Sequence, residues 1–547
     1  MIGLAPGPGD TLPRRHRRGI AKAVALAAAL ALAAMPDWGG SSPGSGVRAT
    51  AAWAAAPAGP VRIEPYLPHE GTLADFYRAR AFRPLWIDAS GLKPEAQAVL
   101  DAVAGAATDG LAPERYRAAW LGEALAQART GDPVALAKAE LLLSRAYADY
   151  VADLRGRAGA ADMMIVEEMA LEPPSAGEVL DAAGATESLR DHVSAALELN
   201  PVYGGLRRGL ADYRARWSKL PQVAVPEGPA LAPGAAGERV ALLRRRLGLE
   251  LGTRFDPALG QAVRAFKQAH GLAGDAVADA ETIAALNRGS GHYERVIRAN
   301  LERARMLPAD PAQRFVLVDA AAARLWLYED GHAVDSMKVI VGKPGQETPA
   351  MAGPIRFAVL NPYWNVPPDL VPKRVAQRVL KDGAAALRRE RFELLRDWSD
   401  DAPRIEPAAV DWKAVASGKR LLRVRQLPGP GNMMGRIKFM IPNKLGIYLH
   451  DTPNKALFDS ADRRLSSGCV RVEDAARLAR WLFGGAAPVA ATDAPEQKVA
   501  LPEAVPLFIT YLTAAPSPAG IVFREDLDAR DAALMAKLDS DGAGSRS

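Results

Sequence analysis

The spacing of apolar residues changes near residue 312, and this change divides the chain into two kinds of structure. Before it, residues 73–88 and 139–157 carry apolar side chains at every third or fourth position, which predicts helices with one buried face. After it, residues 314–342 hold three short apolar runs typical of strands, two of them separated by the turn sequence Glu329-Asp330-Gly331. Because 547 residues are too many for one core, we predict a multidomain α+β protein.

The helical half is divided further by stretches rich in proline and glycine. Residues 36–60 read as a flexible linker, residues 61–222 as a helical scaffold domain, and residues 223–237 as a boundary. Residues 237–288 then form a compact unit of three short helices. In the second of these, Asp256 and Pro257 suit the N-cap and first turn, while Leu259, Val263 and Phe266 share one face.

The N-terminus predicts export. A basic stretch at residues 14–22 precedes an apolar run at residues 23–35, which suits a signal peptide over residues 1–35 and is short for a membrane span. An uncleaved membrane anchor is the alternative, and both place the rest of the chain outside the cytoplasm, in the periplasm. The net charge of +6, from 69 basic and 63 acidic residues, gives no argument for nucleic acid as a partner and suits an acidic polymer or an anionic membrane surface nearby.

The second half predicts a mainly-β domain over residues 312–500, followed by a C-terminal segment, residues 501–547. A charged, helical stretch at residues 369–420 interrupts the strands and reads as an insertion. Its alternative interpretation is a pair of solvated surface helices.

Cys469 is the only cysteine of the chain, so an exported form has no intrachain disulfide. A lone thiol in an oxidising compartment is a liability, which favours a reactive role over the common fate of a small buried side chain. We expect it to precede the N-terminus of a helix over residues 472–482, whose dipole favours a thiolate. His450, at the end of a strand, is the candidate base. The backbone N–H groups of Gly468 and Cys469 are candidate donors to an oxyanion.

The sequence lacks the residues that two other kinds of active site require. A zinc site has neither a second cysteine nor a close pair of histidines, so no metal is expected. A serine hydrolase lacks its Gly-x-Ser-x-Gly turn.

The sequences YLHDTP and SSGCVRV together resemble the L,D-transpeptidase family with its YkuD-type catalytic domain. His450, Ser466, Gly468 and Cys469 fall on the family motif, and Arg471 on its usual arginine, whereas Ser467 stands where the motif has a second histidine. The order of the segments is similar to the large periplasmic, YcbB-like branch. The three-helix unit resembles a peptidoglycan-binding domain, with matches at Val240, Leu243, Leu247, Phe255, Ala262, Val263, Phe266, Gly271 and Leu272.

The resemblance implies a reaction without a cofactor. Cys469 would attack the third residue of a tetrapeptide stem, expel D-alanine and pass the acyl group to a second stem, giving a 3→3 cross-link. His450 would be the base, oriented by the backbone carbonyl of Asp451. Gly468 and Ser467 would complete the catalytic turn, although the role of the replaced histidine is open at Ser467. Carbapenem-type inhibitors would acylate the thiol. Glycan synthases and D,D-carboxypeptidases are conceivable partners.

Further residues are assigned to substrate binding as weaker expectations. Arg471 would hold a stem carboxylate or else pair with Glu473 or Asp474. The remaining candidates are Ser466, Tyr363, Trp364, Asn365, Arg425 and Asn432, for which core packing or solvent exposure is the alternative. The insertion would cap the donor stem. His270, His292 and His332 lie in contexts that look exposed and receive no role.

Three other outcomes stay open. The acyl acceptor is a stem amine, a protein amine or water, and the last would make the protein an L,D-carboxypeptidase. A non-catalytic peptidoglycan-binding protein is the alternative of a different class.

Overall fold

The computed structural model describes residues 57–156, 163–169, 173–309, 313–399, 401–518 and 520–544. The expected signal peptide and nearly all of the expected linker lie outside these residues. Within them, no helix combines the length and the apolar character needed to cross a membrane.

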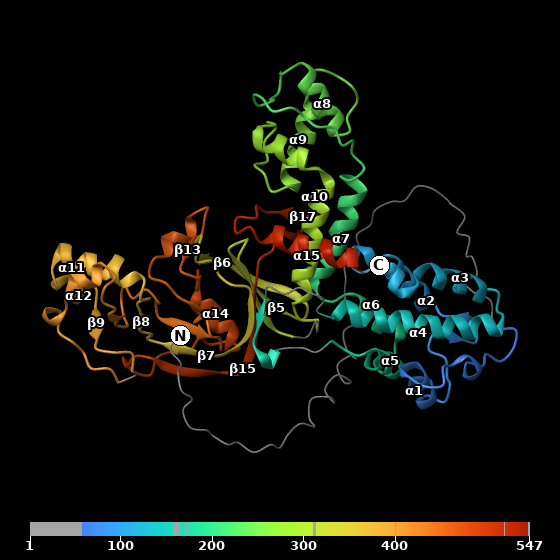
Figure 1. Ribbon diagram of the computed structural model, residues 1–547, viewed down its shortest axis with the longest axis horizontal. Coiled ribbons are helices and arrows are strands. Elements are labelled where there is room, and N and C mark those ends of the chain that lie inside the picture. The colour runs from blue at the N-terminus through green and yellow to red at the C-terminus, as the bar shows by residue number, and fades with distance from the viewer. Residues whose placement is uncertain are drawn as a thin grey trace. The chain divides into compact units, whose positions relative to one another are not determined.

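The first helical region is built around one long buried helix, α4 (Pro133–Arg155), against which α2, α3 and α5 pack (Figure 1). Asp132 caps its N-terminus by accepting a hydrogen bond from the N–H of Ala135. The other helices are α1 (Thr72–Ala79), α2 (Glu95–Ala104), α3 (Ala118–Ala128), α5 (Ala176–Ala185), α6 (Leu189–Leu197) and α7 (Pro201–Arg216), with a small hairpin of β1 (Ile87–Asp88) and β2 (Gly91–Leu92).

The predicted three-helix unit consists of α8 (Glu238–Arg246), α9 (Pro257–Ala269) and the first part of α10 (Ala280–Arg305). Asp256 caps α9 through the N–H of Leu259, as predicted, and the predicted apolar face of α9 is buried. Helix α10 is kinked at Gly289, whose φ of 76° is not helical. The kink separates the third helix of the unit from the connecting helix that follows it.

His270, at the end of α9, is buried and not exposed as the sequence suggested. Its ring stacks on Phe266 and on Phe523, with centroids 3.9 Å and 5.4 Å away. Its Nδ1–H donates to the Phe266 carbonyl at 2.8 Å, and its Nε2 accepts from the hydroxyl of Tyr213 at 3.2 Å. The distant Phe523 supplies a partner that local sequence cannot reveal.

The β half is a ten-stranded sheet in the part of the chain that the structure describes, and eight of its strands close into a ring. The ring runs β11 (Ile437–Met440), β12 (Tyr448–His450), β14 (Val470–Val472), β6 (His332–Gly342), β5 (Arg324–Glu329), β4 (Phe315–Asp319), β15 (Gln497–Thr510) and β7 (Met351–Leu360), which pairs again with β11. Strand β3 (Met164–Ile165) adds to β7, and β13 (Arg464–Ser466) adds to β6. Closure leaves the ring without a free edge.

Two predictions about this domain have different outcomes. The hairpin between β5 and β6 turns at Asp330 and Gly331, both with positive φ, as their sequence predicted. In contrast, the domain does not end at residue 500, because β15 continues to Thr510 and pairs with β4 and β7 up to its end. The boundary was misplaced because Pro502, Glu503 and Pro506 are residue types that are uncommon inside a strand.

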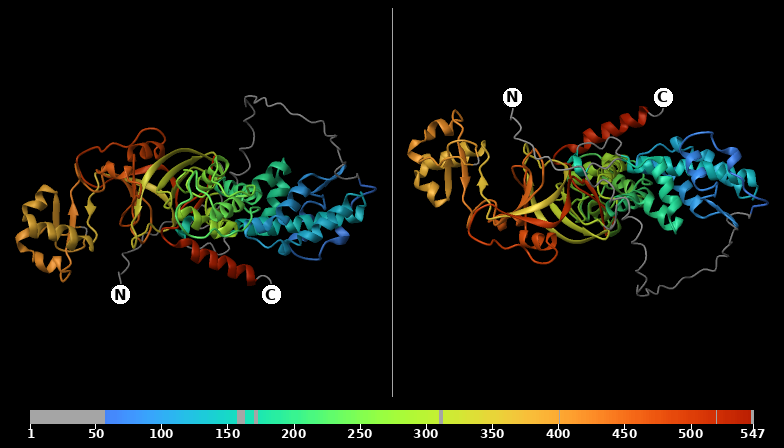
Figure 2. Two further views of the ribbon diagram at one scale, coloured as in Figure 1. Left: turned by 90° about the horizontal axis from the view of Figure 1, so that it is seen from above. Right: turned by 90° about the horizontal axis from the view of Figure 1, so that it is seen from below.

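The insertion is larger than predicted and is not purely helical. A three-stranded sheet of β8 (Trp364–Asn365), β10 (Arg423–Gln426) and β9 (Phe392–Leu395) accompanies a π-helical turn (Val371–Ala376), α11 (Gln377–Asp382), α12 (Ala385–Arg389) and α13 (Trp412–Ala416). Its apolar core extends from Trp364 to Met434 and is separate from that of the ring. Figure 2 shows the group, in light orange, from two further sides.

The chain returns to the helices after β15. Strands β16 (Ala514–Ser517) and β17 (Gly520–Phe523) form a hairpin that packs on α7, and α15 (Arg530–Gly544) packs on α10. The C-terminal segment is therefore integrated with the helical regions.

Candidate active site

Two neighbouring strands present the candidate catalytic residues. Strands β12 and β14 pair in parallel, with Leu449 opposite Val470 and His450 opposite Arg471. Leu449 and Val470 are completely buried in the core of the ring. Since side chains alternate along a strand, Tyr448, His450 and Arg471 lie on the other face, together with Cys469 at the start of β14. The pairing thus brings together the histidine and the cysteine that the sequence singled out.

His450 is held as a neutral imidazole. Its Nδ1 lies 2.5 Å from the backbone carbonyl of Asp451, and because a carbonyl only accepts, Nδ1 carries the proton. Burial, followed by the charge of Arg471, lowers the pKa of His450 to about 3. The Asp451 carboxylate is engaged elsewhere, by the N–H of Arg436 and by Lys455 Nζ. Nε2 of His450 is consequently available as a proton acceptor.

Cys469 is a half-buried thiol whose Sγ lies 3.6 Å from the carbonyl oxygen of Gly446. Burial raises the pKa of Cys469, although the N–H and hydroxyl of Tyr448 and the charge of Arg471 act in the opposite direction. Both the thiol and the imidazole are therefore uncharged at neutral pH.

The expected helix dipole does not act on this thiol. Strand β14 follows Cys469, and helix α14 (Ala475–Leu482) begins only after it, capped by Asp474 through the N–H of Arg477. The prediction was wrong because Val472 was assigned to the helical pattern although it belongs to strand β14.

The turn before Cys469 is held by internal hydrogen bonds. Ser466 is buried, and its hydroxyl donates to the Cys469 carbonyl at 2.6 Å and accepts from the N–H of Gly468 at 3.1 Å. Thr348 Oγ1 donates to the Gly468 carbonyl at 2.8 Å. Gly468 has a φ of 112°, a conformation that only glycine adopts easily.

Two candidate residues of the turn have partners within it. The Gly468 N–H donates to the Ser466 hydroxyl, and that hydroxyl donates to the Cys469 carbonyl, so both groups shape the turn, and their predicted roles towards substrate stay predictions. Ser467, in contrast, is exposed.

Arg471 has no acidic partner among the described residues. The Glu473 carboxylate accepts from the N–H of Lys338, and Asp474 caps α14, so the expected ion pair with either residue is absent. The Nε of Arg471 is buried without a hydrogen-bond partner in the described part of the chain. Burial and the nearby charge of Arg374 lower the pKa of Arg471. A buried, unpaired guanidinium is costly unless an anion completes it.

Three of the weaker candidates belong to the framework of the insertion. Trp364 is buried in its core. Arg425 forms a two-pronged ion pair with Glu393 at 2.9 and 2.8 Å. Asn432 is buried, and its amide donates to three carbonyls, those of Pro362, Gln426 and Leu427, while its oxygen accepts from the N–H of Met434. The partners of these three side chains lie within the insertion, and their roles in substrate binding stay predictions. The sequence showed that they were polar or aromatic but not which partners satisfy them.

Tyr363 and Asn365 remain accessible to different degrees. The ring of Tyr363 is half-buried beneath the guanidinium of Arg425, 4.1 Å from its centroid. Asn365 is exposed and lies opposite Arg425 in the pairing of β8 with β10.

Sequence reasoning missed three residues near Cys469. Tyr448 stands two positions before His450, and this period of two was the available indication. It contacts the core of the insertion, and its ring lies 5.7 Å from that of His450. Arg374 and Thr348 gave no local indication, because each reaches the site from a segment about a hundred residues away.

Family models match three parts of the chain. Residues 71–210 match "Scaffold domain", residues 240–286 match "Putative peptidoglycan binding domain", and residues 313–490 match "L,D-transpeptidase catalytic domain". A curated protein of Haemophilus influenzae named "Putative L,D-transpeptidase" is 34% identical over 189 residues. That alignment covers 34% of this chain and 36% of the relative, so the chain spans about a third of the relative's length.

The solved structures that resemble this chain share little sequence identity with it and have low TM-scores. The L,D-transpeptidase from Xylanimonas cellulosilytica is 16% identical, with 52% of this chain and 98% of that chain covered and a TM-score of 0.16. The L,D-transpeptidase from Mycobacterium smegmatis is 12% identical, with 36% and 59% covered and a TM-score of 0.18. Scores this low support no structural argument. The family models are more informative: residues 313–490 match an L,D-transpeptidase catalytic domain, and the chain combines this match with matches to a scaffold domain and a peptidoglycan-binding domain.

Proposed function

We propose that the protein is an L,D-transpeptidase that forms 3→3 cross-links between peptidoglycan stems through a thioester on Cys469. The observation that carries the proposal is the neutral His450, whose Nδ1 is tied to the Asp451 carbonyl, on the strand beside the cysteine. This arrangement supplies a base next to a nucleophile, which cysteine catalysis requires.

The first half-reaction transfers the donor stem to sulfur. As Sγ attacks the carbonyl carbon of the third stem residue, the thiol proton passes to Nε2 of His450 and the carbonyl oxygen takes the negative charge. The hydroxyl of Tyr448 stabilises negative charge on sulfur, and burial keeps this tyrosine protonated by raising its pKa. Collapse of the intermediate breaks the bond to D-alanine, whose amine leaves with the proton from His450.

The second half-reaction reverses the proton transfers. The acceptor amine attacks the thioester and gives a proton to Nε2, the carbon–sulfur bond breaks, and the proton returns to sulfur. A stem amine gives the 3→3 cross-link, a protein amine attaches that protein to the wall, and water releases a tripeptide.

Arg471 is the candidate for binding a stem carboxylate. Its unpaired guanidinium lies on the face of the sheet that carries Cys469, and Arg374 adds a second positive charge from the insertion. A carboxylate bound there would be attracted by both guanidinium groups. The insertion would then cover the donor stem as the capping subdomain that the resemblance implies.

The peptidoglycan-acting domains favour a location outside the cytoplasm, and we propose the periplasm with export through the N-terminal signal. The glycan polymer is then the substrate on which the small three-helix domain docks.

Intact mass spectrometry with disaccharide-tetrapeptide fragments tests the proposal, with Cys469→Ala as the matched variant. We expect a cysteine-dependent adduct that has lost D-alanine, followed by a 3→3 dimer. An adduct that resolves only to tripeptide identifies water as the acceptor. Binding to cell wall without any adduct would refute the proposal and favour a non-catalytic peptidoglycan-binding protein.

A further inference from the structure

A buried threonine connects the turn before Cys469 with the C-terminal segment. Thr348 donates from Oγ1 to the Gly468 carbonyl and accepts at the same atom from the N–H of Gly342, both at 2.8 Å. Its own backbone carbonyl accepts from Nη2 of Arg530 at 2.8 Å. Arg530 is therefore linked to the residue beside the nucleophile through a single intervening residue.

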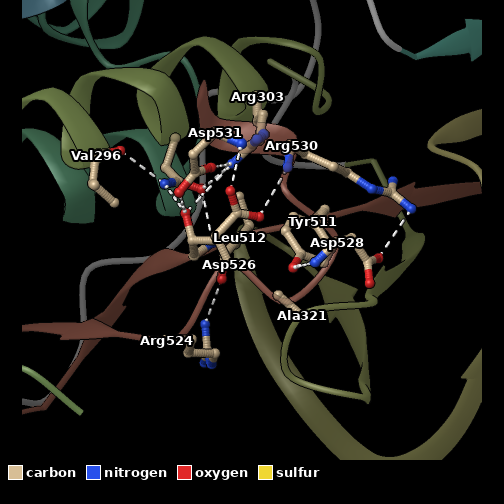
Figure 3. A network of polar contacts seen from close by, with 12 residues as sticks. Val296, Arg303, Ala321, Tyr511, Leu512, Arg524, Asp526, Asp528, Arg530 and Asp531 are labelled. Carbon is tan, nitrogen blue, oxygen red and sulfur yellow. Dashed lines mark hydrogen bonds and ion pairs between the residues drawn. The ribbon is translucent and has the colours of Figure 1, made fainter. Parts of the chain in front are cut away.

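Arg530 is itself fixed in place. Its guanidinium lies over the ring of Tyr511, 4.8 Å from the centroid, and pairs with Asp528 at 3.2 Å (Figure 3). Asp528 also lies 3.9 Å from Arg464, on strand β13, which ends at Ser466. The C-terminal segment thus has two contacts next to the nucleophile turn. Arg530 bonds to Thr348, and Asp528 lies near Arg464 on the strand that leads into the turn.

The next residue anchors the segment on helix α10. Asp531 pairs with Arg303 at 2.6 Å and accepts from the hydroxyl of Thr513 at 2.7 Å. Thr513 also exchanges hydrogen bonds with Asn300, at 2.8 and 3.0 Å. Asn300, Thr513 and Asp531 are buried, so this anchor is shielded from water and from salt.

The turn needs such support because of its glycine. The peptide planes around Gly468 have few steric restraints, and its φ of 112° is one of several accessible conformations. A hydrogen bond to the Gly468 carbonyl selects one of them and with it the direction of the Cys469 side chain.

We propose that residues 511–518 and 520–531 brace the nucleophile turn, and that Arg530 is a positioning residue for Cys469. The inference rests on the proposed transpeptidase function for its kinetic consequence. It assigns a catalytic contribution to a segment beyond the matched catalytic domain, which ends at residue 490.

The test uses the full chain and four variants. Arg530→Ala removes the group that donates to the Thr348 carbonyl, and Arg530→Lys keeps a donor there. Thr348→Val removes the hydroxyl that donates to the Gly468 carbonyl but keeps the shape of the side chain. The fourth variant combines Arg530→Ala with Thr348→Val. Arg480→Ala, an exposed arginine on α14, is the matched control. For each protein we would measure kcat and KM of cross-linking, the rate of Cys469 alkylation by iodoacetamide against pH, and Tm.

We expect Arg530→Ala and Thr348→Val each to lower kcat by about tenfold to a hundredfold with little change in KM, because a displaced nucleophile is costly. The alkylation profile should shift in both, Arg530→Lys should recover much of the loss, and the double variant should be no worse than the worse single variant.

Wild-type kcat and alkylation in Arg530→Ala would overturn the proposal. So would a loss of activity that merely follows a lower Tm and is not rescued by lysine. If the wild type forms no cross-links, the proposed function fails, but the alkylation profile still decides whether Arg530 positions the thiol.

Discussion

At the scale of single residues, the chemistry of the candidate active site depends on two groups that are uncharged at neutral pH. The thiol of Cys469 and the imidazole of His450 share a face of the sheet, and burial opposes the charged form of each. A standing thiolate–imidazolium pair is therefore disfavoured, and the proton transfer belongs to the attack itself. Such a resting state suits a protein with a lone thiol in an oxidising environment, because a thiol oxidises more slowly than a thiolate.

Alkylation of Cys469 tests this resting state. Because the pKa of the thiol is raised, we expect the rate with iodoacetamide to keep rising through pH 9, without a plateau near neutrality. Arg471→Met should move the profile further towards alkaline pH, since the charge of Arg471 lowers that pKa. The control is Arg480→Met on the exposed face of α14. A plateau between pH 6 and 7 would show an ion pair and contradict the expectation.

Carbapenem acylation is a second prediction for the same sulfur. We expect the mass of the protein to increase by that of one drug molecule, because the strained lactam carbonyl presents an electrophile to the same thiol and base. Cys469→Ala should remain unmodified, and His450→Gln should react much more slowly. An unchanged wild-type mass in excess drug would contradict the prediction.

The insertion, at the scale of elements, behaves as a small domain with its own sheet and core. Asn432 joins its pieces by bonding to the backbone of β10, of the segment before β8 and of its own turn. The insertion meets the ring at two residues, because Arg374 lies near Arg471 and Tyr448 of the ring contacts the core of the insertion.

Replacing Asn432 should loosen the insertion. We expect Asn432→Ala to cost about 2–3 kcal/mol of unfolding free energy, because it leaves several buried polar groups without partners. Hydrogen exchange should show the loss in the backbone amides of β9 and β10. The exposed Asn365→Ala should change stability by less than about 0.5 kcal/mol. Equal effects of the two variants would refute the structural role of Asn432.

Local pattern predicted the elements whose cause is local. The cap of α9 at Asp256, the turn at Asp330 and Gly331, and the strand that ends at His450 all follow from neighbouring residues. The cysteine and histidine of the site were found because their types are rare in the chain.

The remainder depends on distant partners. Arg425 and Asn432 looked available because Glu393 and the carbonyl of Pro362 lie far from them in the sequence. The strand β14 was hidden because three residues are too few to establish a period.

At the scale of the whole molecule, His270 connects three elements that are far apart in the sequence. It lies at the end of α9, accepts a hydrogen bond from Tyr213 of α7 and stacks on Phe523 of β17. Burial, with a smaller contribution from the charge of Arg246, lowers its pKa to about 4. The unfolded chain therefore binds a proton between about pH 6.5 and pH 4 that the folded chain does not. Stability contributed by this residue is complete above that window and is lost as the pH falls through it.

Thermal unfolding between pH 7 and pH 4 measures this loss. The wild type should lose on the order of 3 kcal/mol through His270. His450 acts in the same direction. His270→Phe should be less stable at pH 7, because Tyr213 loses its acceptor, but its stability should fall less steeply with acid. His332→Gln, at an exposed position, is the control. An unchanged slope in His270→Phe would show that His270 is already protonated in the folded state.

Strand β15 also determines when the ring can close as the chain is synthesised. It lies between β4 and β7 in the ring, yet both of those strands precede it by more than a hundred residues. Until residue 510 has emerged, β4 and β7 have no strand between them, and the ring that aligns β12 with β14 stays open. Pairing across such a sequence distance is slow. We therefore expect the thiol to become a working nucleophile only once residue 510 has joined the ring, so that, on the proposed export route, an incompletely translocated chain does not yet react with peptidoglycan.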